Sequence, residues 1–178
     1  MASRILFLLS TMLVLYPFCL FWHEFLHTVI ARLRGWAHEI TFTPFGPLQG
    51  SRSFAQARVW FPIDPTKAQL FWFATAPRLF ALVALPLTAW SAVELPLPST
   101  LRWILAALYC CWLIDFVFNS LLIFEPESEI IDSWTTFRAV EGWCDVHFFE
   151  GLTLISCGVA TTLGAWVMTS LARTAVPW

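Results

Sequence analysis

The sequence predicts an all-α polytopic membrane protein with about four transmembrane helices and a small strand-like insertion after the first. Of its 178 residues, 58% are hydrophobic and only 12% are charged, with a mean hydropathy of +0.70. Soluble domains carry about 25% charged residues. Four apolar segments are long enough to cross about 30 Å of hydrocarbon as helices. No internal repeat interrupts the chain, so we expect a single integral-membrane domain over residues 1–178.

The first apolar segment runs from about Ile5 to Ala31. Its beginning has the apolar character of a signal peptide, but the run is long and no small-x-small cleavage site follows it. The expected helix continues straight into the pentapeptide HEFLH, residues 23–27. We therefore expect an uncleaved membrane helix.

The other three apolar segments run from about Ala68 to Val93, Leu101 to Phe124 and Phe148 to Leu171. The connection ELPLPST, Glu94–Thr100, is short and rich in proline, which indicates a turn between antiparallel neighbours. The connection Glu125–His147 is longer and acidic.

The strand-like insertion is expected in the connection Gly35–Lys67. It contains ITFTPFGPLQGSRSF, where β-branched and aromatic residues are mixed with Gly and Pro. This mixture is typical of a short hairpin or an extended strand. The stretch Ile40–Phe54 is therefore a candidate edge strand to which an extended peptide would bind.

The distribution of basic residues predicts the orientation in the lipid bilayer. Six of the ten Lys and Arg residues fall on the side of the two longer connections and three on the other side. The first group is Arg32, Arg34, Arg52, Arg58, Lys67 and Arg138, and the second is Arg4, Arg102 and Arg173. This asymmetry places the longer connections, and a site near them, on the cytoplasmic side. A net charge of −2 and the lack of a basic block argue against a nucleic-acid partner.

HEFLH is the strongest chemical signal in the chain. On a helix, His23 and His27 lie on one face, one turn apart, and are able to bind one metal ion. Glu24 is adjacent to the first histidine and within reach of a water molecule at that metal. This is the H-E-x-x-H arrangement of zinc hydrolases. Ionisable residues inside membrane helices are costly and usually mark a functional site. The competing interpretation places these residues in the headgroup zone, close to Arg32.

A catalytic zinc site needs a third protein ligand and an open position. Two carboxylates are candidates, Asp115 within the third apolar segment and Asp132 after the acidic connection. Asp115 also has an alternative role, as a hydrogen-bond partner between helices or an ion-pair partner of Arg78. For Arg78 itself, orientation of a substrate carbonyl and extension to the membrane interface are equally compatible with the sequence.

HEFLH in an expected membrane helix is followed downstream by FNSLL and then by IIDSW. With these motifs, roughly residues 21–134 resemble the site-2 protease family of intramembrane zinc metalloproteases. In that family an Asn closes one helix and an Asp before a small residue is the third zinc ligand. The resemblance implies a Zn2+ cofactor bound by His23, His27 and Asp132, with Glu24 as general base and Asn119 holding the substrate strand or stabilising the oxyanion.

The expected function is therefore hydrolysis of peptide bonds in membrane-protein substrates. The alternative is a non-proteolytic membrane scaffold or assembly subunit of a larger complex that keeps the metalloprotease fold. A third interpretation is a metal transporter or haem-binding subunit with the histidines as ligands. The adjacent His and Glu make hydrolysis the more natural chemistry.

Overall fold

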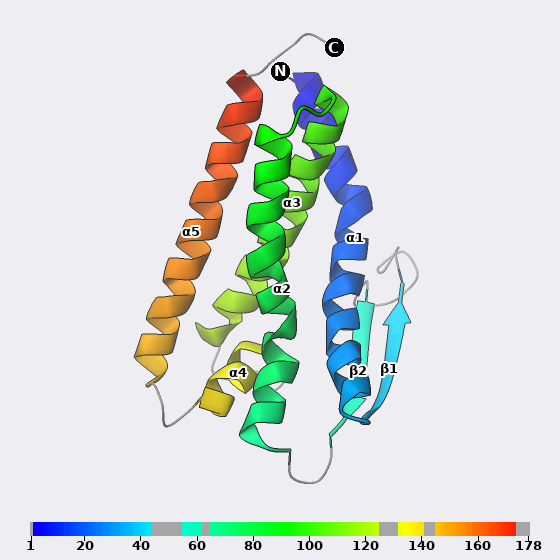
Figure 1. The fold of residues 1–178 in the computed structure, drawn as a ribbon, viewed down its shortest axis with the longest axis vertical. Helices are drawn as coiled ribbons and strands as arrows, with labels where there is room; N and C mark the ends of the chain where they lie inside the picture. The colour runs from blue at the N-terminus through cyan, green and yellow to red at the C-terminus, as the bar shows by residue number, and fades with distance from the viewer. Residues whose placement is uncertain (1, 44–54, 62–64, 125–131, 141–144, 174–178) are drawn as a thin grey trace.

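The computed structural model describes residues 2–43, 55–61, 65–124, 132–140 and 145–173 of the chain. This part is mostly helical, with one two-stranded sheet (Figure 1).

Four long helices form the body of the protein: α1 (Ala2–Leu33), α2 (Lys67–Glu94), α3 (Ser99–Leu121) and α5 (Val146–Arg173). Each helix, α3 together with its 3-10 extension to Phe124, is long and apolar enough to cross a membrane. The predicted multi-pass membrane architecture is confirmed, and the helix bounds differ from the predicted ones by a few residues.

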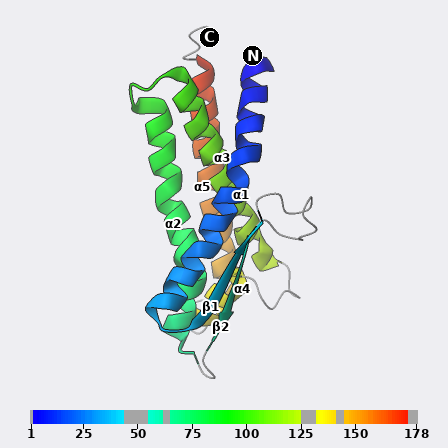
Figure 2. The same ribbon diagram turned by 90° about the vertical axis from the view of Figure 1, so that its right-hand side faces the viewer.

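The start of α1 and the end of α5 lie at the same end of the bundle (Figure 1). The sheet and the short helix α4 (Asp132–Val140) lie at the opposite end, and a view at right angles shows the same arrangement (Figure 2). The described parts of the two longer connections therefore lie at the same end of the bundle.

The sheet is a hairpin of β1 (Ala37–Phe42) and β2 (Ala55–Trp60), paired antiparallel. The prediction of a strand-like insertion is confirmed, although the second strand follows the stretch Ile40–Phe54 on which we expected an edge strand. Most of that stretch, residues 44–54, lies outside the described residues.

The chain turns from α1 into β1 at Gly35, whose φ of 70° lies in the left-handed region that favours glycine. The Trp36 amide donates to the Ala31 carbonyl at 2.9 Å and closes the end of the helix. The hairpin then runs back along α1, and the Phe42 ring lies 4.8 Å from the Phe21 ring, centre to centre. The sheet is thereby held beside the part of α1 that carries HEFLH (Figure 1).

Helix α4 was not anticipated in the acidic connection. Its sequence DSWTTFRAV has an acidic residue at its start and Arg138 in its last turn, the charge order that complements a helix dipole. Helix α4 packs against α2. It also contacts α3 and the 3-10 turn Leu122–Phe124, which follows α3.

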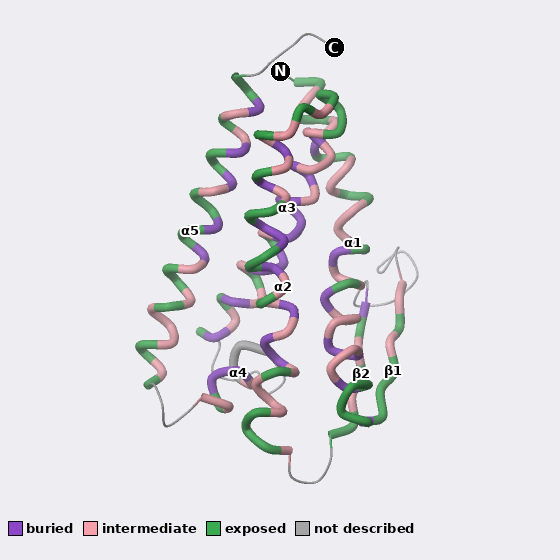
Figure 3. The backbone as a smooth tube through the Cα atoms, viewed as in Figure 1, coloured by how far each residue is buried: buried purple, intermediate pink, exposed green. Residues whose placement is uncertain are grey.

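Small residues allow the helices to approach closely. The buried face of α2 is mainly alanine, at Ala74, Ala81, Ala84, Ala89 and Ala92. Between membrane helices, such residues increase van der Waals contact. Large apolar side chains are instead exposed on the long helices, as Leu13, Val83 and Ile155 illustrate. Exposed positions recur along the helices of the bundle (Figure 3).

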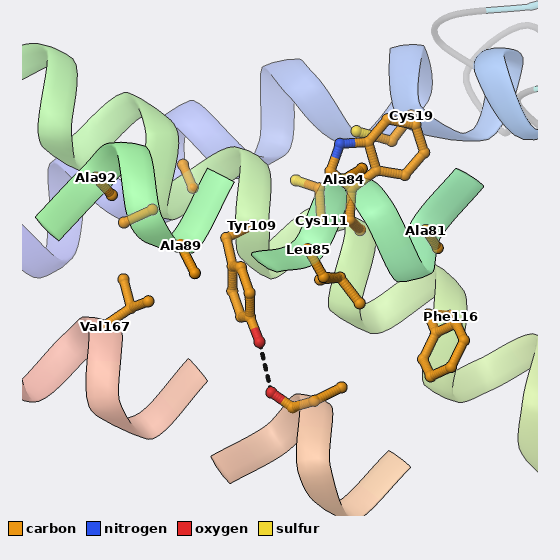
Figure 4. Close-up of a cluster of buried hydrophobic side chains, with 14 of the residues drawn as sticks. Cys19, Ala81, Ala84, Leu85, Ala89, Ala92, Tyr109, Cys111, Phe116 and Val167 are labelled. Atoms are coloured by element: carbon orange, nitrogen blue, oxygen red, sulfur yellow. Dashed lines mark hydrogen bonds between the residues drawn. The ribbon is translucent and has the colours of Figure 1, made fainter. Parts of the chain in front are cut away.

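Helix α5 packs on α3 through Tyr109, whose hydroxyl donates to the Ala160 carbonyl (Figure 4). A Cβ atom at Gly164 would lie 3.0 Å from Cε1 of the buried Tyr109 ring. Gly158, six residues earlier on α5, has no neighbouring atom within 4 Å of such a position.

We therefore expect Gly164→Val to destabilise the protein by about 1–3 kcal/mol, the usual cost of overpacking. Gly158→Val is the matched control, because it makes the same chemical change on the open face of the helix. Thermal unfolding in detergent measures both. Equal loss of stability in the two variants would contradict the close packing of Tyr109 on α5.

Candidate metal centre

The two histidines of HEFLH lie side by side on α1 and face the interior of the bundle. His23 and His27 are 6% and 4% exposed, and their ring centres are 5.2 Å apart. Glu24 is half-buried beside them. The helical spacing thus places the two imidazoles side by side in the interior of the bundle.

Asp115 of α3 orients His23. Its Oδ2 lies 2.8 Å from Nδ1 of His23, and Asp115 is itself only 4% exposed. A carboxylate accepts a hydrogen bond, so Nδ1 of His23 carries a proton, and in the neutral form of the ring the lone pair is then on Nε2. Metal-binding histidines are commonly held in this way by a carboxylate or a carbonyl on their second nitrogen.

His27 is oriented by the backbone of α2. Its Nδ1 donates to the Phe73 carbonyl at 2.9 Å, and its ring packs against the Phe73 ring. In a regular helix the amide of residue 77 would bond to that carbonyl, but residue 77 is a proline and has no N–H. Pro77 therefore leaves the Phe73 carbonyl available to His27.

This arrangement predicts that Pro77→Ala weakens metal binding by a few-fold, because the backbone N–H that the substitution introduces would compete with His27 for the Phe73 carbonyl. Pro86→Ala is the matched control, since Pro86 also lies inside α2 but four residues after Leu82, away from the site. Zinc affinity measured by competition with a chelating dye distinguishes the two. The same affinity in both variants would show that Pro77 has no part in positioning His27.

Asp115 is held in turn by α3 and α2. The Asn119 side-chain amide donates to Oδ1 of Asp115 at 2.9 Å and to the Asp115 carbonyl at 3.0 Å. Arg78 of α2 donates from Nη2 to the Asn119 carbonyl at 3.0 Å. That carbonyl is in the last turn of α3, where carbonyls lack helical partners and a positive charge is favourable. Arg78 thus contacts the end of α3, a role that neither interpretation of the sequence included.

Glu24 contacts the hairpin. Its Oε2 accepts a hydrogen bond of 2.8 Å from the backbone amide of Ala57 in β2. A cavity of about 660 Å³ opens here, lined by His23, Glu24 and His27, by residues 56–60 of β2, and by Asn119, Leu122 and two phenylalanines, Phe61 and Phe73. The cavity is large enough for several residues of an extended peptide.

The residues present suit a zinc ion. Imidazole nitrogen is a preferred zinc ligand, each imidazole has an acceptor on its Nδ1, and the Glu24 carboxylate lies next to them. Among the side chains that the structure describes, no group of three His, Cys, Asp or Glu residues is placed to hold a metal. Asp132 begins α4 at this end of the bundle, and its side chain lies outside the described part. Asp115 has both of its oxygens engaged with other side chains, His23 and Asn119.

The structure brings four of the five predicted site residues to one place. Asn119 lines the cavity as expected, but its amide nitrogen contacts Asp115. Sequence reasoning missed the Phe73 carbonyl and the Ala57 amide, because a backbone group has no signature in the sequence. The proline four residues after Phe73 was the one available signal. No family model, curated protein or solved structure matches this chain.

Proposed function

We propose that the protein is an intramembrane zinc metalloprotease, similar to the site-2 protease family. The observation that carries the proposal is the pair His23 and His27, each with Nδ1 hydrogen-bonded, opening with Glu24 onto one cavity. Bound zinc would polarise a carbonyl and lower the pKa of a water molecule toward about 7. Asp132 is proposed as the third ligand, and the site is proposed to face the cytoplasm.

Glu24 acts as the general base in this proposal. Its carboxylate faces the cavity beside the two histidines and takes the proton of the attacking water. The same carboxyl group then gives the proton to the leaving amine. The half-buried position of Glu24 keeps it close to water in the cavity while the bundle holds its neighbours in place.

Strand β2 supplies the surface on which a substrate is held. A helical peptide bond is protected by its own hydrogen bonds, so a membrane segment has to become extended before water attacks it. An extended segment in the cavity lies along residues 56–60 and binds by adding a strand to the sheet. The Phe61 and Phe73 rings, 5.0 Å apart, offer apolar contact for its side chains.

Metal removal tests the proposed function. Detergent-purified protein is incubated with a set of single-span membrane proteins, before and after treatment with 1,10-phenanthroline, and then after zinc is restored. We expect cleavage that stops with the chelator and returns with zinc. If a well-folded protein binds zinc yet cleaves no substrate in the set, the proposed protease function is contradicted. Stable co-purification with a membrane partner would then support the scaffold function.

A further inference from the structure

We propose that the Ala57 amide restrains Glu24 in the resting protein, and that an extended substrate releases Glu24 by taking over this amide. This inference rests on the proposed function and concerns the regulation of the same site. It starts from one contact, the 2.8 Å hydrogen bond from Ala57 N to Glu24 Oε2.

The strand register shows which edge of the hairpin this amide belongs to. Ala57 lies opposite Ile40 in β1, yet its N–H is donated to Glu24 on α1. In an antiparallel pair, residues alternate between those that bond to the partner strand and those whose N–H and C=O point away from it. The backbone N–H and C=O of Ala57 therefore point away from β1, and so do those of Val59, two residues further along the strand.

The outward edge of β2 is the edge that lines the cavity. Residues 56–60 share the cavity with the two histidines and Glu24. A peptide that adds to this edge needs outward N–H groups as donors for its own carbonyl oxygens. The first such donor beside the histidines, Ala57, is already bonded to Glu24, so the carboxylate occupies the place that a substrate carbonyl would take.

Glu24 and a substrate carbonyl compete for the Ala57 N–H, and this competition couples substrate binding to catalysis. A carboxylate oxygen accepts the Ala57 N–H, so Oε2 of Glu24 is held against β2. When a substrate carbonyl accepts this N–H instead, the Glu24 side chain loses that contact and is able to turn toward the histidines and the attacking water. Glu24 thus reaches its working position only when a strand is bound beside it.

Hydrogen exchange tests the contact without depending on catalysis. The Ala57 amide is compared between the wild type and Glu24→Ala, with the Val59 amide as an internal control. We expect Ala57 to exchange at least about tenfold faster in the variant, as the loss of a charge-assisted hydrogen bond implies, with Val59 unchanged. Equal exchange of Ala57 in both proteins would overturn the inference and leave the proposed function standing.

Steady-state kinetics of zinc-loaded protein tests the coupling. Ala57→Pro removes the N–H that Glu24 uses, and Val59→Pro removes the next outward N–H. Neither variant removes a hydrogen bond between the strands, because both amides point away from β1. Val59→Pro is therefore the matched control.

We expect Ala57→Pro to raise kcat by about tenfold, because Glu24 is released, and to raise KM, because a donor for the substrate is lost. Val59→Pro should raise KM with no rise in kcat. If the wild type cleaves substrate but kcat in Ala57→Pro is unchanged or lower, the restraint of Glu24 by Ala57 is overturned and the proposed protease function stands. Absence of cleavage in the wild type overturns the proposed function and this inference together.

Discussion

Replacing Glu24 by Gln should reduce peptide cleavage by about a hundredfold to ten-thousandfold, the range expected for loss of a general base. Glutamine keeps the size of the side chain and an oxygen that accepts the Ala57 N–H, so the hairpin stays in place. It cannot take a proton from water at neutral pH. The zinc content should stay at the wild-type level, because His23 and His27 are untouched.

Glu39→Gln is the control for this variant. Glu39 is an exposed glutamate on β1, in the same hairpin but absent from the cavity lining, and the substitution makes the same chemical change. The measurement is the cleavage rate per zinc-loaded chain for the three proteins. Full activity in Glu24→Gln would rule out Glu24 as the base, and an equal loss in Glu39→Gln would point to a general effect of charge.

Replacing Asp115 by Leu should weaken zinc binding by about 10- to 100-fold, the usual effect of removing a group that orients a ligand. The 2.8 Å contact with Nδ1 holds both the ring orientation and the tautomer of His23. Without it, the proton of the neutral ring is able to move to Nε2, which then has no lone pair for a metal. Zinc affinity and the 15N chemical shifts of His23 in the metal-free protein measure the two effects.

The stability of the metal-free protein is measured alongside, because Asp115 also supports the fold. Removing one partner of a buried pair is destabilising, since His23 Nδ1 and the Asn119 amide lose their acceptor. We therefore expect Asp115→Leu to lower the unfolding temperature in the absence of metal, and zinc affinity is compared at a temperature at which both proteins are folded. Zinc affinity equal to that of the wild type would contradict the orienting role of Asp115.

The sequence predicted the fold well because a bilayer leaves few choices. Long apolar runs form helices in hydrocarbon, because a helix satisfies all of its backbone N–H and C=O groups within one segment, whereas an open sheet leaves those at its edges without partners. Both histidines and Glu24 were predictable for the same reason, as ionisable residues at a helical spacing where apolar ones belong. The hairpin was predictable in kind, because β-branched and aromatic residues lie between Gly and Pro in the connection after α1.

The geometry of the site was less predictable. Asp115 and Arg78 were recognised as buried charges, but their partners depend on how α1, α2 and α3 are rotated against one another. The Phe73 carbonyl and the Ala57 amide are backbone groups, and their roles follow from packing. Helix α4 was missed because a short helix with mixed polarity gives a weak periodic signal.

The most direct measurement of the central claim is the zinc content per chain of detergent-purified protein, taken for the wild type, His27→Ala, Asp115→Leu and Asp132→Ala. The account predicts about one zinc in the wild type, loss in His27→Ala and Asp132→Ala, and retention at saturating zinc in Asp115→Leu. A well-folded wild type that takes up no zinc, even from added metal, would contradict it.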